Sequence, residues 1–108
     1  MAGLELFILG SPRIYSDGLP IEFDARKNLA LIAYLGVTRE CHNREAIITL
    51  LWPESEPSRT RAILRRNLSV LKKSLSGEYL LVDRETVGLN FDKSVWSDVE
   101  LFKQLATS

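Results

Sequence analysis

Short apolar stretches separated by turn residues open the chain and predict three strands. The first runs from Leu4 to Leu9, and the glycine that follows ends it. Strands from Arg13 to Ser16 and from Pro20 to Phe23 come next, because the Asp17-Gly18 pair between them is a strong hairpin signal. The chain is therefore expected to begin with strands, two of which form a hairpin.

Helical spacing replaces this pattern after Phe23. Asp24 is placed to cap a helix from about Ala25 to Val37, because its side-chain oxygen can accept from free N–H groups of the first turn. The apolar residues that recur at helical intervals in this range are Leu29, Ile32, Ala33 and Leu35. Their spacing places one face of the helix in the core.

Two further helices are predicted before the next glycine. Asn43 caps a helix from Arg44 to Leu51, and Pro53 stops it because proline cannot continue a helical ladder. The third helix begins at Pro57 or Ser58, since proline is favoured in a first helical turn. It ends near Ser76-Gly77, where glycine supplies a C-terminal stop.

The remaining residues predict a hairpin and a last helix. Tyr79 to Asp83 and Thr86 to Asn90 form two short strands, and Val95 to Ser97 adds a last short pairing. Asp98 caps a helix from Val99 to Ala106. Three strands, three helices and a hairpin is the order of an α+β winged helix, a helix-turn-helix variant whose third helix enters the major groove of DNA.

The third helix has two chemically different faces. Its leucines recur at helical spacing and form one stripe that faces the core: Leu64, Leu68, Leu71 and Leu75. We expect the first three of them to pack with Leu29, Ile32 and Trp52, and we interpret both Trp52 and Trp96 as core anchors. The opposite side of the helix carries Ala62, Arg65, Arg66, Ser69 and Lys73.

Charge is distributed unevenly along a chain whose net charge is zero. The 108 residues include 14 basic and 14 acidic side chains, yet every charged residue from Pro57 to Ser76 is basic. A neutral chain with one basic helix suits a localised anionic partner, since only this surface attracts one. The alternative stays open that these cations only keep the helix solvated, and that Lys72 and Lys73 complement the helix dipole at its C-terminus.

Composition excludes several classes of protein. Hydrophobic residues make up 45% and charged residues 26% of the chain, which is ordinary for a soluble globular domain. Cys41 is the single cysteine and cannot form an internal disulfide, no apolar run approaches the ~20 residues of a membrane span, and no signal peptide is evident. We therefore expect a cytoplasmic domain without a membrane partner.

Motifs for catalysis or cofactor binding are also lacking. Cys41-His42 is an adjacent pair without the second pair of ligands that a zinc site needs. The sequence contains neither a glycine-rich phosphate loop nor a nucleophile motif. We expect no metal, no cofactor and no enzymatic activity.

Five stretches follow one another along nearly the whole chain: LELFILGSPRIYSDGLPIEF, RKNLALIAYL, NREAIITLLWPESEPSRTRAILRRNLSVLKKSL, LLVDRETVGLN and VWSDVELFKQL. In this order they resemble the OmpR-type winged-helix domain at the N-terminus of SARP-type transcriptional activators of bacteria. The third stretch is the most specific, because Leu51-Trp52-Pro53 leads into an acidic loop and then into the basic helix.

The resemblance implies an N-terminal antiparallel sheet, three helices and a C-terminal β-hairpin wing, in a regulator that binds double-stranded DNA sequence-specifically. It implies a winged-helix domain over residues 1–97. Residues 98–108 would then start a linker or helix leading to a C-terminal activation domain of the full-length protein. It also implies contact with RNA polymerase through the loop between the second and third helices, which corresponds here to Glu54, Ser55 and Glu56.

The expected DNA-binding residues of the third helix are Arg59, Arg61, Arg65, Arg66, Ser69, Lys72 and Lys73. Arginine forms bidentate hydrogen bonds to guanine, and both arginine and lysine neutralise phosphates. In the wing we expect Arg84 and Thr86 to contact the DNA backbone or the minor groove.

One departure from the family and one rival interpretation accompany this hypothesis. Many relatives carry arginine at the positions of Val70 and Lys72, and valine can contact only a thymine methyl group. The rival interpretation is a winged-helix module for protein–protein contact, in which the basic helix docks an acidic partner.

Overall fold

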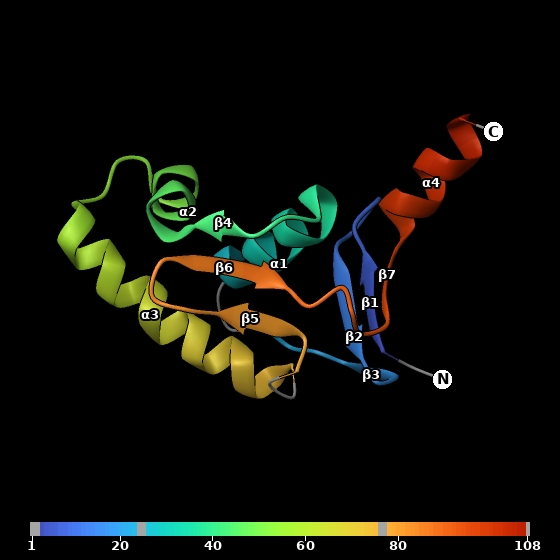
Figure 1. Cartoon of the computed structure of the whole chain (residues 1–108), viewed down its shortest axis with the longest axis horizontal. Helices are drawn as coiled ribbons and strands as arrows, with labels where there is room; N and C mark the ends of the chain where they lie inside the picture. The colour runs from blue at the N-terminus through green and yellow to red at the C-terminus, as the bar shows by residue number, and fades with distance from the viewer. Residues whose placement is uncertain (1–2, 24–25, 76–77, 108) are drawn as a thin grey trace.

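The computed structural model describes residues 3–23, 26–75 and 78–107. Within these residues, two small sheets and three helices form an α+β body compatible with a winged helix, and a fourth helix projects from it (Figure 1). The first sheet has the order β3 (Leu19–Pro20), β2 (Arg13–Ser16), β1 (Leu4–Phe7), β7 (Val95–Ser97). The second has the order β4 (His42–Asn43), β6 (Thr86–Leu89), β5 (Leu80–Val82). The helices are α1 (Arg26–Thr38), α2 (Arg44–Leu51), α3 (Pro57–Ser74) and α4 (Asp98–Thr107).

The first sheet begins as the predicted antiparallel hairpin and is completed by the end of the chain. Asp17 and Gly18 adopt positive φ angles of 51° and 84°, which matches a tight turn between β2 and β3. Pairing starts directly after this turn, so β3 is shorter and earlier than the predicted strand from Pro20 to Phe23. β7 pairs with β1 in parallel, which confirms the predicted short pairing near the C-terminus.

The junction between β1 and α4 corrects two predictions. The backbone N–H groups of Ile8 and Leu9 donate to the carboxylate of Asp98, at 2.9 and 3.1 Å, so β1 ends before Ile8 and not at Leu9. Asp98 was expected to cap α4, which is wrong. The hydroxyl of Ser97 accepts from the N–H of Val99 at 3.1 Å and takes that role, because the carboxylate of Asp98 is engaged by the end of β1.

The starts of α2 and α3 agree with the sequence. The side chain of Asn43 accepts a hydrogen bond of 2.8 Å from the N–H of Glu45, which confirms the predicted cap of α2. Pro57 stands in the first turn of α3, as expected. The predicted cap at Asp24 and the predicted stop at Ser76-Gly77 lie outside the described residues.

The leucine stripe of α3 lies in the core, as predicted. None of its four members is more than 3% exposed: Leu64, Leu68, Leu71 and Leu75. Ile32 of α1 is fully buried in the same cluster, whereas Leu29 and Trp52 are partly buried and pack against its edge. The stripe thus determines which side of α3 faces solvent.

The interpretation of Trp96 as a core anchor is wrong. Its side chain is 39% exposed and packs on the ring of Phe7, with centroids 5.1 Å apart, on the outer face of the first sheet. Successive side chains of a strand point to opposite faces. Because Ser97 is buried, the neighbouring Trp96 points outward.

The two-residue strand β4 was not predicted, because so short a segment shows no alternation of apolar and polar residues. His42 pairs with Val87 and Asn43 with Thr86. The pairing is close: a Cβ atom on Gly88 would lie 2.4 Å from the sulfur of Cys41, so only glycine fits there. This contact places the start of α2 beside the wing, which is the β5–β6 hairpin.

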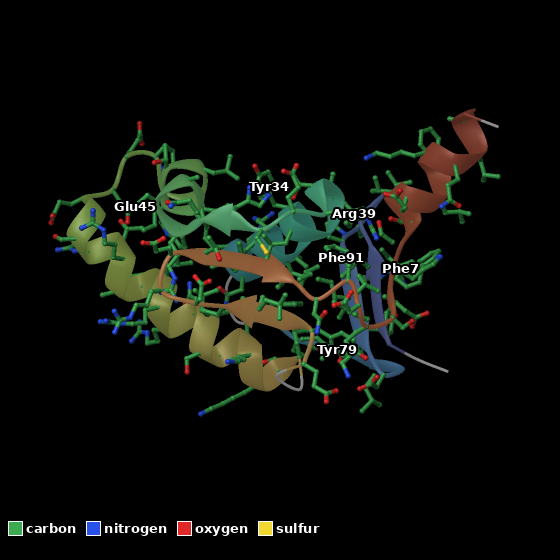
Figure 2. All side chains as sticks on the ribbon, viewed as in Figure 1. Phe7, Tyr34, Arg39, Glu45, Tyr79 and Phe91 are labelled. Carbon is green, nitrogen blue, oxygen red and sulfur yellow. The ribbon has the colours of Figure 1, made fainter. Side chains whose placement is uncertain are left out.

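A polar contact joins the two halves of the molecule. The hydroxyl of Tyr79, which is labelled in Figure 2 and lies just before β5, donates to the carboxylate of Asp17 in the first hairpin turn, at 2.9 Å. This hydrogen bond raises the pKa of Tyr79, since the carboxylate holds the phenol proton. The first sheet and the wing are therefore tied together at the C-terminal end of α3.

We predict that Leu68→Ala lowers the free energy of unfolding by about 2–5 kcal/mol, because it leaves a cavity beneath α3. Val70→Ala is the matched control, since the side chain of Val70 is 47% exposed on the same helix, and should change stability by less than about 0.5 kcal/mol. Urea denaturation of both variants measures the difference. Equal stability of the two variants would contradict the buried position of the stripe.

Candidate nucleic-acid interface

The outward side of α3 carries the exposed cations that the sequence predicted. Five residues opposite the leucine stripe are exposed: Ala62, Arg65, Arg66, Ser69 and Lys73. Arg59 and Lys72 are exposed as well. Figure 2 shows the nitrogen-tipped side chains along this side of α3, away from the sheets. Among the described residues, none of these arginines and lysines is held in an ion pair. They are free to meet an anionic surface.

The wing lies beside α3 and ends in a tight turn. Asp83 shapes this turn: its carboxylate accepts from the N–H groups of Thr86 and Glu85, at 2.7 and 2.8 Å. These two backbone hydrogen bonds lower the pKa of Asp83, because they stabilise the ionised form. Arg84, at the tip, is exposed, and Thr86 is partly buried. Of the two predicted wing contacts, Arg84 is therefore the more accessible.

A cleft of about 540 Å³ separates α3 from the start of α2 and the wing turn. Its lining brings together four arginines from three elements: Arg44, Arg61, Arg65 and Arg84. Glu45 and Glu85 line it too, so the cleft has mixed charge. The structure thus gathers three of the predicted DNA-binding residues around one hollow: Arg61 and Arg65 from α3, and Arg84 from the distant wing turn.

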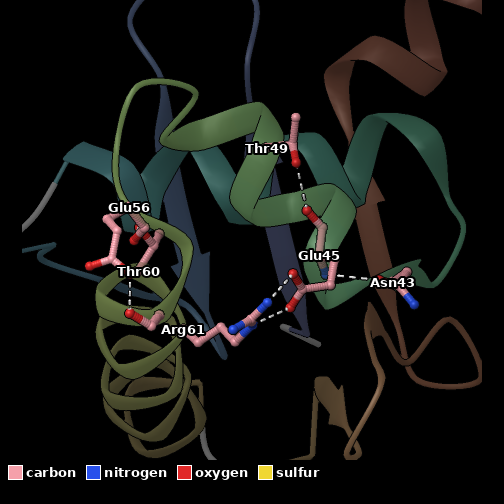
Figure 3. Close-up of polar contacts among 7 residues, drawn as sticks. Asn43, Glu45, Thr49, Glu56, Thr60 and Arg61 are labelled. Carbon is pink, nitrogen blue, oxygen red and sulfur yellow. Dashed lines mark hydrogen bonds and ion pairs between the residues drawn. The ribbon is translucent and has the colours of Figure 1, made fainter.

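Arg61 is not free, unlike the other predicted cations of α3. Its Nε and Nη2 atoms donate to the two carboxylate oxygens of Glu45 in α2, at 2.8 and 3.1 Å (Figure 3). The hydrogen bonds lower the pKa of Glu45 and raise the pKa of Arg61, because each charge stabilises the other. Sequence reasoning could not find this pair, since the residues lie on different helices.

Arg44 is a residue of the site that sequence reasoning missed. Its backbone N–H donates to the carbonyl of Glu85 at 2.7 Å, and its guanidinium donates to the carbonyl of Asp83. It therefore fastens the wing turn to the start of α2. Its Nε atom is buried without a partner among the described residues. The only signal in the sequence was a cation directly after a helix cap, which is too common to be informative.

The acidic loop between α2 and α3 is exposed at Glu54, Ser55 and Glu56. Glu56 also has a local role, because its carbonyl accepts from the hydroxyl of Thr60 at 2.8 Å and its carboxylate accepts from Ser58 (Figure 3). It stands directly before α3 and helps to begin that helix. Glu54 and Ser55 are the members of the loop whose side chains have no such role in the described structure.

Neither a cluster of metal ligands nor a membrane-spanning helix is found among the described residues. No group of three histidine, cysteine or acidic side chains lies close enough there to hold a metal ion. None of the helices in residues 3–23, 26–75 and 78–107 is long and apolar enough to cross a membrane.

Comparison with known proteins gives a partial match. The chain is 36% identical over 78 residues to the transcriptional regulatory protein EmbR of Mycobacterium bovis and of Mycobacterium tuberculosis. These relatives are regulators of transcription. The match covers 68% of this chain and 19% of each relative, so the chain spans about a fifth of the length of the curated relatives it matches. No family model matches the chain.

We predict that acid loosens the wing through Asp83. The pKa of Asp83 is lower in the folded chain than its ordinary value of 3.8, so its contribution to stability is present above that value. The contribution is lost as the pH falls through the lowered pKa of the folded state. The difference in unfolding free energy between the wild type and Asp83→Ala should shrink over this acidic range.

Asp83→Asn is the control, because it keeps the acceptor oxygen and does not titrate. The difference in unfolding free energy between Asp83→Asn and Asp83→Ala should stay constant with pH. Urea denaturation of the three proteins at a series of pH values makes the comparison. A wild-type advantage over Asp83→Ala that is independent of pH would refute the role of the ionised carboxylate.

Proposed function

We propose that the chain is a sequence-specific double-stranded-DNA-binding domain of a bacterial transcriptional regulator. In this proposal α3 enters the major groove and the wing contacts the adjacent backbone or minor groove. The observation that carries it is a row of exposed cations on α3, away from the buried leucine stripe, which have no ion pair among the described residues: Arg59, Arg65, Arg66, Lys72 and Lys73. The similarity to a transcriptional regulatory protein supports the same conclusion.

The two halves of α3 have different roles in this proposal. Arg65 and Arg66 lie at the middle of the 18-residue helix, N-terminal to the two lysines. In helix-turn-helix proteins the more N-terminal part of this helix contacts base edges, so we assign at least one of the two arginines to a base. Ser69 is small and exposed beside them, and allows the helix to approach the DNA closely. Lys72 and Lys73 lie near the end of the helix, where phosphates of the groove wall are expected.

The domain organisation implied by the resemblance remains a proposal. The winged-helix domain covers residues 1–97, and residues 98–108 begin the connection to a C-terminal activation domain. α4 starts at Asp98, whose carboxylate binds the end of β1, so the connection leaves the domain in a defined direction (Figure 1).

We further propose that the exposed loop of Glu54, Ser55 and Glu56 contacts RNA polymerase. Carboxylates repel phosphates, so these residues face away from the DNA in the bound state. Their exposure beside the start of α3 leaves them accessible to a protein bound next to the regulator.

The decisive test of DNA binding distinguishes residues that contact base edges from residues that only neutralise phosphates. Alanine variants of Arg65, Arg66, Lys72 and Lys73 are titrated with a selected site and a scrambled site across a salt series. Loss of the base-reading arginine should cost about 1–3 kcal/mol on the selected site and relax the preference at one base pair. Loss of either lysine should weaken both sites alike and reduce the salt slope by about one unit.

Two outcomes would overturn this assignment. If all four variants lose specific and non-specific binding in equal proportion, α3 is an electrostatic patch that does not read bases. If none loses affinity for DNA, the basic helix docks an acidic protein instead, and the rival interpretation replaces the proposal.

The acidic loop has its own test in the full-length regulator. We predict that Glu54→Gln combined with Glu56→Gln leaves DNA affinity almost unchanged and lowers activated transcription. Glu54→Gln alone is informative as well, because its side chain makes none of the contacts that Glu56 makes at the start of α3. Undiminished transcription with both glutamines would remove the loop from the activation mechanism.

A further inference from the structure

The contact between Arg61 and Glu45 differs from an ordinary surface ion pair. Many exposed ion pairs have variable geometry and contribute little to folding stability, but a bidentate arginine–carboxylate pair has fixed geometry. Here two hydrogen bonds of 2.8 and 3.1 Å join the guanidinium of α3 to the carboxylate of α2 (Figure 3). The side chains remain 56% and 55% exposed, so both still lie within reach of a large ligand.

Arg61 lies on the flank of α3 that faces the cleft. At roughly 100° per residue, Arg61 stands about 60° from Leu64 around the helix, and Arg65 about 100°. The cleft that both arginines line also contains Arg84 of the wing turn. A DNA strand that runs between α3 and the wing would pass this flank.

The carboxylate of Glu45 changes the charge that the DNA strand meets at Arg61. A free guanidinium binds a phosphate and releases the counterions condensed on it, whereas a guanidinium already neutralised by a carboxylate contributes little to this release. A glutamate carboxylate is already ionised at neutral pH, and the hydrogen bonds from Arg61 lower the pKa of Glu45 further. At this point of the surface the DNA therefore meets a neutral pair.

We propose that Glu45 sets the affinity of the domain for DNA by holding Arg61 out of the group of cations that bind phosphates. This inference rests on the proposed DNA-binding function and makes it more specific, since it divides the basic residues of α3 into free cations and one restrained cation. By restraining Arg61, Glu45 lowers the affinity of the domain for all DNA sequences and does not change which sequence is preferred.

The test is a double-mutant cycle on the intact chain. Glu45→Gln, Arg61→Gln and the double variant bind one DNA duplex across a salt series, after thermal melting has confirmed that each is folded. Glu45→Gln should steepen the salt slope by about 0.9, the value for one additional phosphate contact. Between 50 and 200 mM salt, a fourfold increase, the affinity of Glu45→Gln for DNA should then fall about 3.5-fold more than that of the wild type, because four raised to the power 0.9 is about 3.5.

The other members of the cycle decide how Glu45 acts. The double variant should keep the wild-type slope, because it replaces a neutral ion pair with two uncharged side chains. Arg61→Gln should have a slope no steeper than that of the wild type, because it leaves the carboxylate of Glu45 without its cation. Two matched controls calibrate the scale. Lys73→Gln removes an exposed cation of α3 that is assigned to a phosphate and has no ion pair in the described structure, and should reduce the slope by about 0.9. Glu54→Gln removes an exposed acid of the loop, and should leave the slope unchanged.

Three results would overturn the inference. A slope reduced in the double variant would show that Arg61 binds phosphate in spite of Glu45. A double variant with a slope steeper than that of the wild type would show direct repulsion between Glu45 and DNA. An unchanged slope in Glu45→Gln, with the expected loss in Lys73→Gln, would show that the pair only braces α2 against α3. If the wild type and every variant show no salt-dependent binding, the proposed function fails as well.

Discussion

The buried leucine stripe of α3 is the constraint on which the candidate interface depends. A helix that buries one stripe must present the opposite one, and the four leucines are at most 3% exposed. The outward side therefore cannot turn toward the core without exposing these side chains. The apolar contribution to folding thus orients the arginines and lysines, although none of them takes part in the packing.

A second group of contacts positions the wing relative to this helix. β4 pairs with β6, and Arg44 binds the turn between β5 and β6 through the carbonyls of Asp83 and Glu85. Because α2 starts directly after β4, these contacts hold the cap of α2 against the wing turn. On the side of the cleft that faces α3, the wing is therefore held by the β4–β6 pairing and by the contacts of Arg44 with the wing turn.

The sequence predicted the parts of the fold that local patterns determine. The stripe of α3, the Asn43 cap and the hairpin turn at Asp17 each follow from spacing or from the chemistry of a few adjacent residues. The winged-helix order followed from the succession of these elements.

Predictions failed where the partner of a group lies far away in the chain. Asp98 and Ser97 are both good helix caps, and only the approach of β1 decides which one serves α4. Trp96 is as apolar as a core residue, but its position in β7 turns it to the outer face. In the candidate site, the exposure of the cations on α3 was predictable, whereas the restraint on Arg61 depends on the distance between two helices.

The most direct measurement is a selection of bound sequences from random double-stranded DNA, made with the chain at near-physiological salt. A helix that reads base edges should enrich one recurring motif through successive rounds, because each correct base pair contributes about 1–3 kcal/mol. We expect such a motif, with positions that lose their preference when Arg65 or Arg66 is replaced by alanine. Recovered sequences that show no enrichment, from a chain that retains DNA only at low salt, would contradict the reading of base edges by α3.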